Sequence, residues 1–64
     1  MDTGIVKMYN SEKGFGFITC SNTGQDFFFH ITGVKGDEPA ENDKVEFNIT
    51  EGKKGLQAID VKKV

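Results

Sequence analysis

The sequence predicts an all-β fold, a barrel of five short antiparallel strands. No window shows a sustained helical period, and the best helical candidate, residues 39–43, is about one turn long. Apolar residues gather instead in short runs that Gly, Asn, Asp and Ser separate. Closing these runs into a barrel removes the exposed edges that an open sheet of this size would leave.

The runs follow one another through short turns, except for one longer polar connection over residues 32–42. Asn10-Ser11-Glu12 forms the first expected turn, and residues 51–55 form the expected hairpin loop between the last two strands. The five expected strands are 4–10, 13–20, 26–31, 44–50 and 56–62.

The last two expected strands show period-two patterns. Val45, Phe47 and Ile49 alternate with polar residues, so they are expected on one side of their strand. Ile59 and Val61 have the same spacing in the final strand. This alternation is typical of β-strands.

The chain has 64 residues, so residues 1–64 are expected to form a single domain. So small a core predicts a marginal stability of about 3–5 kcal/mol. The single cysteine, Cys20, cannot form an internal disulfide, and with one histidine it fits no zinc spacing. We therefore expect no metal, no cofactor and a reduced, buried or half-buried thiol. No segment resembles a signal peptide or a membrane span, so a soluble cytoplasmic protein is expected.

The formal net charge of −2 argues mildly against a nucleic-acid partner, but the charges are unevenly distributed. Five acidic residues and one lysine lie between positions 37 and 46. The lysines form separate basic patches elsewhere, at positions 7, 13, 53–54 and 62–63. The charge pattern therefore permits a phosphate-facing side without requiring one.

Strand parity divides the aromatic residues into two sets. In the second strand Phe15 and Phe17 share a face, opposite the face of Gly14, Gly16 and Ile18. In the third, Phe28 and His30 lie opposite the all-apolar set of Phe27, Phe29 and Ile31. The economical arrangement buries Ile18, Phe27 and Phe29 and exposes Phe15, Phe17, Phe28 and His30. The opposite parity, with Phe15 and Phe17 in the core, would turn Ile18 outward.

Three phenyl rings and an imidazole on one exposed sheet face need a ligand, since they would otherwise promote aggregation. Flat rings stack on the π-faces of single-stranded bases, and stacking tolerates many sequences. Lysines near the rings, Lys7, Lys13 and Lys54, would contact phosphates and make binding salt-dependent. We therefore predict a ligand of single-stranded RNA or DNA.

The segment Lys13-Gly14-Phe15-Gly16-Phe17-Ile18 resembles the first ribonucleoprotein motif, and Phe27-Phe28-Phe29-His30-Ile31 resembles the second. With Asn10-Ser11-Glu12 before the first motif, the whole chain is similar to bacterial cold-shock proteins. The resemblance implies a five-stranded barrel of the oligonucleotide/oligosaccharide-binding type. It further implies a protein, usually monomeric, that binds single-stranded RNA and DNA, unwinds weak RNA structure and affects transcription or translation on cooling.

The same resemblance implies a set of binding positions: Lys7, Lys13, Phe15, Phe17, Phe28, His30 and Lys54. Asn10 and Asp26 would contact bases or order loops. The chain departs from the family where Met8 replaces an exposed Trp, where Ile31 replaces Phe, and where the connection near residues 36–43 is short and lacks a Phe. Met8 and Ile31 can touch a base without offering a flat ring, so we expect weaker binding that engages fewer nucleotides.

Catalysis and protein interaction are the two alternatives to nucleic-acid binding. Catalysis is not expected, because His30 and Asp26 lie about 13 Å apart along one strand and no nucleophile accompanies them. A protein-interaction module remains an alternative, since the acidic residues 37–46 could meet a protein partner. His30 has an alternative role of its own, as a polar residue at a strand end bonded to a neighbour.

Overall fold

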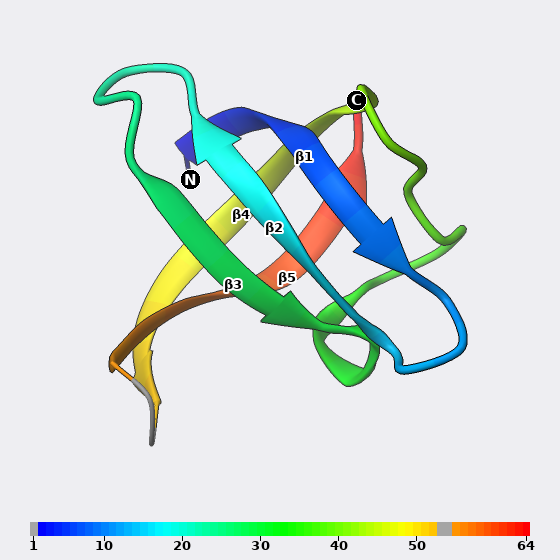
Figure 1. Ribbon diagram of the computed structural model, residues 1–64. Coiled ribbons are helices and arrows are strands. Elements are labelled where there is room, and N and C mark those ends of the chain that lie inside the picture. Colours follow the sequence, from blue (N-terminus) through cyan, green and yellow to red (C-terminus); the bar gives the residue numbers. More distant parts are fainter. Residues whose placement is uncertain (1, 53–54) are drawn as a thin grey trace.

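The computed structural model describes residues 2–52 and 55–64 and shows a closed five-stranded barrel (Figure 1). A short 3₁₀ turn, η1 (Ile31–Gly33), follows the third strand. The strands are β1 (Asp2–Asn10), β2 (Phe15–Cys20), β3 (Asp26–His30), β4 (Lys44–Gly52) and β5 (Gly55–Lys63). The predicted all-β barrel of the oligonucleotide/oligosaccharide-binding type is confirmed, whereas Ile31 belongs to η1 and not to a strand.

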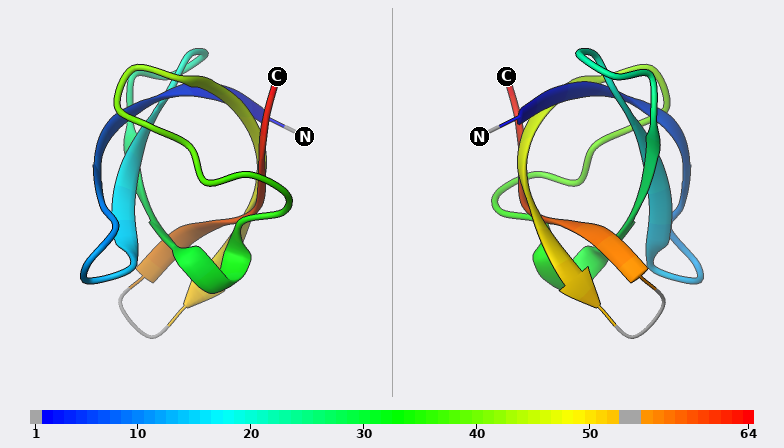
Figure 2. Two further views of the ribbon diagram at one scale, coloured as in Figure 1. Left: turned by 90° about the vertical axis from the view of Figure 1, so that its right-hand side faces the viewer. Right: turned by 90° about the vertical axis from the view of Figure 1, so that its left-hand side faces the viewer.

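The order of strands around the barrel is β1-β2-β3-β5-β4. The connection between β3 and β4 crosses the barrel (Figure 2), so that β4 returns beside β1 and β5 completes the ring against β3. All pairings between strands are antiparallel except β3 with β5, which run parallel where Phe28 lies beside Gln57 and Phe29 beside Ala58. Closure therefore places the start of β5 next to the aromatic strand β3.

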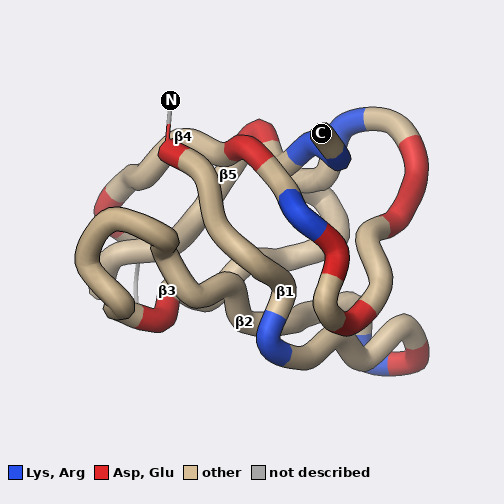
Figure 3. Tube along the Cα trace, turned by 90° about the horizontal axis from the view of Figure 1, so that it is seen from above, with Lys and Arg blue, Asp and Glu red and all other residues tan. Residues whose placement is uncertain are grey.

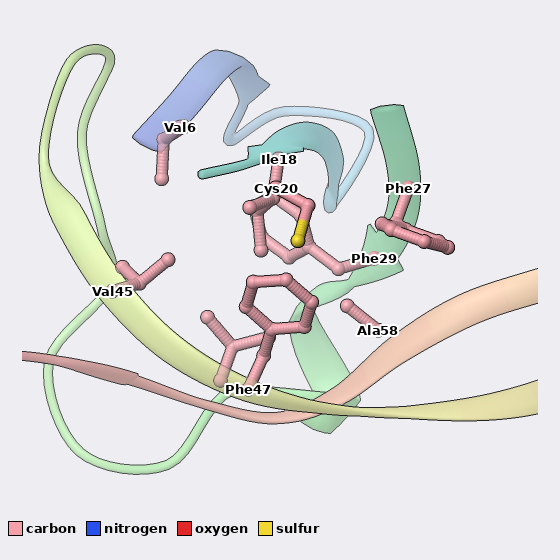
Figure 4. Close-up of a cluster of buried hydrophobic side chains, with 9 residues drawn as sticks. Val6, Ile18, Cys20, Phe27, Phe29, Val45, Phe47 and Ala58 are labelled. Carbon is pink, nitrogen blue, oxygen red and sulfur yellow. The ribbon is translucent and has the colours of Figure 1, made fainter. Parts of the chain in front are cut away.

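The barrel interior is filled by apolar side chains from all five strands (Figure 4). Phe29 is fully buried and stacks on Tyr9, with ring centroids 5.7 Å apart and planes 8° from parallel. Phe27 packs against Phe47 at 6.1 Å. The buried set is Val6, Ile18, Cys20, Phe27, Phe29, Val45, Phe47, Ala58 and Val61. The expected burial of Ile18, Phe27, Phe29 and the Cys20 thiol is confirmed.

A bulge in β5 changes the side on which its apolar residues lie. Asp60 adopts a positive φ of 53°, and the register against β4 shifts between Glu46 and Asn48. The extra residue turns Ala58 and Val61 into the core, while Ile59 is only half-buried. The period-two spacing of Ile59 and Val61 was therefore a wrong guide to a shared face.

The alternation in β4 predicts the core only over its first half. Val45 and Phe47 are fully buried, but Ile49 is 37% exposed. Ile49 lies towards the end of β4, in the part of β4 and β5 that projects beyond the rest of the barrel (Figure 1). Period-two spacing fixes the side of a strand but not whether another layer packs against it.

The Tyr9 hydroxyl is buried and has no hydrogen-bond partner among the described residues. Burial raises the pKa of Tyr9, and the Glu38 carboxylate on the β3–β4 connection, which approaches the hydroxyl without the geometry of a hydrogen bond, raises it further. A buried hydroxyl without a partner costs about 1–3 kcal/mol. We expect Tyr9→Phe, which keeps the stack on Phe29, to raise the free energy of unfolding by about 1 kcal/mol. Urea denaturation measures this change, and a destabilised variant would show that the hydroxyl is satisfied in solution.

Candidate nucleic-acid interface

Four aromatic side chains project from β2 and β3 on the outer face of the barrel. Antiparallel pairing sets Phe15 opposite His30 and Phe17 opposite Phe28. Side chains of directly opposed residues lie on the same face of a sheet, so this register brings the four rings together. We call Phe15, Phe17, Phe28 and His30 the aromatic platform. The three phenyl rings are half-buried and the imidazole is exposed, as strand parity predicted.

The phenyl rings of the platform support one another. Phe15 and Phe28 lie 5.9 Å apart with planes 25° from parallel. Phe17 meets both edge-on, at 6.4 Å from Phe15 and 6.0 Å from Phe28. Offset-stacked and edge-to-face pairs at these distances are favourable arrangements for aromatic rings. Mutual packing therefore holds each ring in place while leaving part of its surface accessible.

Gly16 explains why Phe15 and Phe17 point outward. A Cβ atom at Gly16 would lie 2.5 Å from the Met8 carbonyl oxygen and 2.8 Å from the ring of Phe29. The inner side of β2 thus has no space for a side chain at this position, because the Phe29 ring occupies it. The close approach of Phe29 fixes the parity of β2, and the platform follows from that parity.

The platform forms one wall of an open hollow of about 490 Å³. The other wall comes from the start of β5, where Leu56 is 50% exposed. The residues from β5 that line the hollow are Gly55, Leu56 and Gln57. These three residues were not predicted, because nothing in the sequence of β5 shows that it pairs with β3 or that Leu56 is exposed.

A second, smaller hollow continues from Phe17 and is lined by Lys7, Met8, Phe17 and Asp26. The register of β1 against β2 shifts between Val6 and Met8, and Lys7 lies at the shift. Val6 is therefore buried opposite Ile18, while Met8 pairs with Phe17 on the outer face. Without this bulge Val6 and Met8 would share one face. The irregularity brings Lys7 and Met8, neighbours in sequence, to the same outer hollow.

Lys7 and Asp26 form an ion pair, with Nζ 2.9 Å from Oδ2. The Thr19 hydroxyl donates a hydrogen bond of 2.7 Å to the other carboxylate oxygen. This hydrogen bond, followed by the hydrogen bond and charge of Lys7, holds the pKa of Asp26 below its usual range. The carboxylate thus holds Lys7 beside the second hollow, and both side chains remain substantially exposed, at 62% for Lys7 and 40% for Asp26.

The lowered pKa of Asp26 predicts a pH dependence of stability. Ionised Asp26 stabilises the fold above the unfolded pKa of about 4, and this contribution is lost as pH falls through the lower folded pKa. We expect Asp26→Asn to destabilise the protein near neutral pH, with the difference from wild type shrinking as pH falls below about 4. Chemical denaturation over this pH range measures it. Asp37→Asn, a control on the β3–β4 connection, should not show the same profile.

The remaining predicted site residues lie around the β1–β2 turn and η1. The Asn10 side-chain oxygen accepts hydrogen bonds from the backbone N–H groups of Glu12 and Lys13, both at 3.1 Å. Asn10 therefore orders the turn that carries the exposed Lys13, and loop ordering is one of the two roles expected for it.

Ile31 is half-buried in η1, and its backbone N–H donates to the Gly14 carbonyl at 2.8 Å. Neither Asn10, Lys13 nor Ile31 lines the two hollows, and Lys54 lies outside the described residues.

His30 is bonded to a neighbour at the end of its strand, which is one of the two roles expected for it. It also lines the main hollow with the phenyl rings, where its expected stacking on bases stays a prediction. Its Nδ1 accepts a hydrogen bond of 3.2 Å from the Thr32 backbone N–H, and the Thr32 hydroxyl lies 3.0 Å from the same nitrogen. His30 thereby caps η1 while remaining exposed on the platform.

The acidic segment 37–46, which we call the acidic connection, lines neither of the two hollows. Its residues stand beside the C-terminal lysines (Figure 3), where Lys63 pairs with Asp43 at 3.5 Å. Lys35 pairs with Asp60 at 3.4 Å nearby. Within the described ranges, 2–52 and 55–64, no group of three His, Cys, Asp or Glu side chains is placed to hold a metal ion. In the same part of the chain, no helix is long and apolar enough to cross a membrane.

A closed five-stranded barrel with an aromatic outer face defines the class of oligonucleotide/oligosaccharide-binding folds. Residues 2–64 match the model of the "Cold-shock" DNA-binding domain, and the chain belongs to this cold-shock domain family. The family is a family of nucleic-acid-binding domains. The resemblance found in the two ribonucleoprotein motifs is thereby confirmed.

Individual relatives agree with the family match. The chain is 50% identical over 62 residues to cold shock-like protein CspG of Shewanella violacea, covering 92% of this chain and 89% of that one. It is 45% identical to the major cold shock protein of Micrococcus luteus over the full length of both chains. Among solved structures, Drosophila Unr CSD456 is similar, with a TM-score of 0.80 and 34% identity. That match covers 98% of this chain and 26% of the Drosophila chain.

Proposed function

We propose that this protein binds single-stranded RNA and DNA with low sequence specificity by stacking bases on the aromatic platform. The observation that supports the proposal most directly is that three phenyl rings and the His30 imidazole line one open hollow. Each stacked base contributes about 1–3 kcal/mol, and every base offers a π-face. A duplex keeps its bases stacked inside, so only single strands can use such a surface.

The charged residues near the platform support the same ligand. Lys7 borders the second hollow, and Lys13 is exposed on the β1–β2 turn. Phosphates following the stacked bases would meet these ammonium groups and release counterions. As a monomer in the cytoplasm, the protein would act as an RNA chaperone or as a regulator of transcription or translation during cold shock. Holding unwound RNA open requires only binding, without catalysis.

Titration of labelled seven-base oligo-dT and oligo-rU tests the proposal, with a duplex of the same length as control. We expect saturable binding to the single strands that weakens steeply from about 50 to about 200 mM salt. Absence of saturable binding at low salt would contradict the proposal. The alternative, a protein partner on the acidic connection, predicts an interaction that survives moderate salt and depends on residues 37–46.

Binding should be weaker than on a platform with more rings, because Met8 borders the second hollow without a flat ring. We expect Met8→Trp to tighten oligo-dT binding about 5-fold, since one added stacking contact contributes about 1 kcal/mol. Fluorescence of the introduced indole, the only tryptophan in the chain, reports the contact directly. Ile49→Trp is the matched control, because Ile49 is exposed but lines neither hollow. Equal gains from both variants would contradict a specific contact at position 8.

A further inference from the structure

His30 makes a bond that a ring used only for stacking does not need. Its backbone is extended, with φ −108° and ψ 151°, and it stands at the N-terminal end of η1. Two donors of Thr32 converge on one ring nitrogen, the backbone N–H at 3.2 Å and the hydroxyl at 3.0 Å from Nδ1. The imidazole is thus fixed by a residue that does not line the main hollow.

The hydrogen bond from the Thr32 backbone N–H determines which nitrogen of the imidazole carries the proton. A backbone N–H can only donate, so Nδ1 must accept and carries no proton of its own. In the neutral imidazole the proton then belongs to Nε2, because the bond at one ring nitrogen decides the state of the other. A proton on Nδ1 would face the Thr32 N–H and break the cap of η1.

The His30 side chain is exposed, so Nε2 can be reached from outside. A Cβ atom added at Gly14 would lie 4.0 Å from Nε2, which is ordinary van der Waals contact and no clash. Among residues 2–52 and 55–64, none provides an acceptor that is hydrogen-bonded to Nε2. The Nε2–H group is therefore a donor held at the main hollow without a partner in the described part of the chain.

We propose that Thr32 is a positioning residue of the binding face: it holds His30 as the neutral tautomer whose Nε2–H donates to an oxygen atom of the bound nucleotide. This inference rests on the proposed function and adds a polar contact to a face otherwise built from phenyl rings. Unlike Lys7 and Lys13, this donor carries no charge. Its acceptor is an oxygen, which either a base carbonyl or a phosphate can supply.

The tautomer can be tested on the free protein, independently of any ligand. Long-range ¹H–¹⁵N correlation spectra at neutral pH should show one tautomer, with Nε2 protonated and Nδ1 unprotonated. Thr32→Pro removes the backbone N–H that requires Nδ1 to accept, together with the hydroxyl, and should shift both nitrogen signals towards an average. Thr32→Ser keeps the hydroxyl and should restore the wild-type spectrum. A protonated Nδ1, or averaged signals in the wild type, would overturn the proposal.

A double-mutant cycle tests the role in binding. Thr32→Pro, which lacks the backbone N–H, should weaken oligo-dT binding about 3-fold in the His30 protein. In a His30→Phe background, which keeps a stacking ring but no nitrogen, Thr32→Pro should have no effect. An equal loss in both backgrounds, or none in either, would overturn the proposal. If wild-type protein binds no oligonucleotide, the proposed function fails, whereas the spectra still decide the tautomer separately.

The source of the oxygen acceptor is found with two matched ligands. His30→Phe is compared on oligo-dT and on the same oligomer with difluorotoluene in place of thymine, which keeps the shape of the base but lacks its carbonyl oxygens. An equal loss of affinity on both identifies a phosphate as the acceptor. A loss confined to the natural oligomer identifies a base carbonyl. Either result supports the proposal, and no loss on either ligand overturns it.

Discussion

Phe28→Ala is expected to weaken the binding of single-stranded oligonucleotides about 5- to 150-fold while leaving the barrel folded. This range is the loss of about 1–3 kcal/mol that one base-stacking ring contributes. Phe28 has the largest expected effect on the platform because its two ring contacts, at 5.9 and 6.0 Å, are both shorter than the 6.4 Å between Phe15 and Phe17. Its removal eliminates one stacking surface and the lateral support of two more.

The measurement is a titration of labelled oligo-dT at low salt, accompanied by far-UV circular dichroism to confirm folding. Ile49→Ala is the matched control, since it also removes an exposed apolar side chain but lies outside both hollows. It should bind as the wild type does. A Phe28→Ala protein that is folded and binds with unchanged affinity would show that the ligand, if any, uses another surface.

The division of β2 and β3 into inner and outer faces could be predicted because side-chain alternation in a strand is a local property. Phe28 and Phe29 are neighbours, yet one lines the hollow and the other is fully buried, as parity required. Local alternation fails wherever a bulge adds a residue. Lys7 in β1 and Asp60 in β5 mark two such places, and neither was foreseen. Asp60 adopts a positive φ without being glycine, which its sequence context does not indicate.

The parts of the site that could not be predicted depend on contacts between distant segments. Leu56 and Gln57 reach the hollow only because β5 pairs in parallel with β3, which is a property of barrel closure. The cap that His30 forms on η1 depends on a 3₁₀ turn that begins at Ile31, where the strand was expected to continue. The sequence thus predicted the rings and the residues of the second hollow, but not the wall from β5 or the contact of His30 with Thr32.

Phe29→Ala is expected to leave the chain largely unfolded at room temperature. Removing a buried phenyl ring costs about 3–5 kcal/mol, which equals the whole stability expected of a domain of this size. The cavity cannot collapse easily, because the Phe29 ring is stacked between Tyr9 and the bare inner surface of β2 at Gly16. Backbone atoms line that surface, and they cannot move inward without breaking the pairing of β1 with β2.

Phe28→Ala is the matched control for Phe29→Ala, because the two substitutions remove the same ring from adjacent positions. Phe28→Ala should change affinity and keep a cooperative urea transition, whereas Phe29→Ala should lose the transition. Any residual oligonucleotide binding by Phe29→Ala would be reduced by its folded fraction and should recover as ligand shifts the equilibrium towards the native state. A Phe29→Ala protein with wild-type stability would show that the outer and inner faces of β3 are assigned the wrong way round. The same finding would remove the structural basis of the aromatic platform.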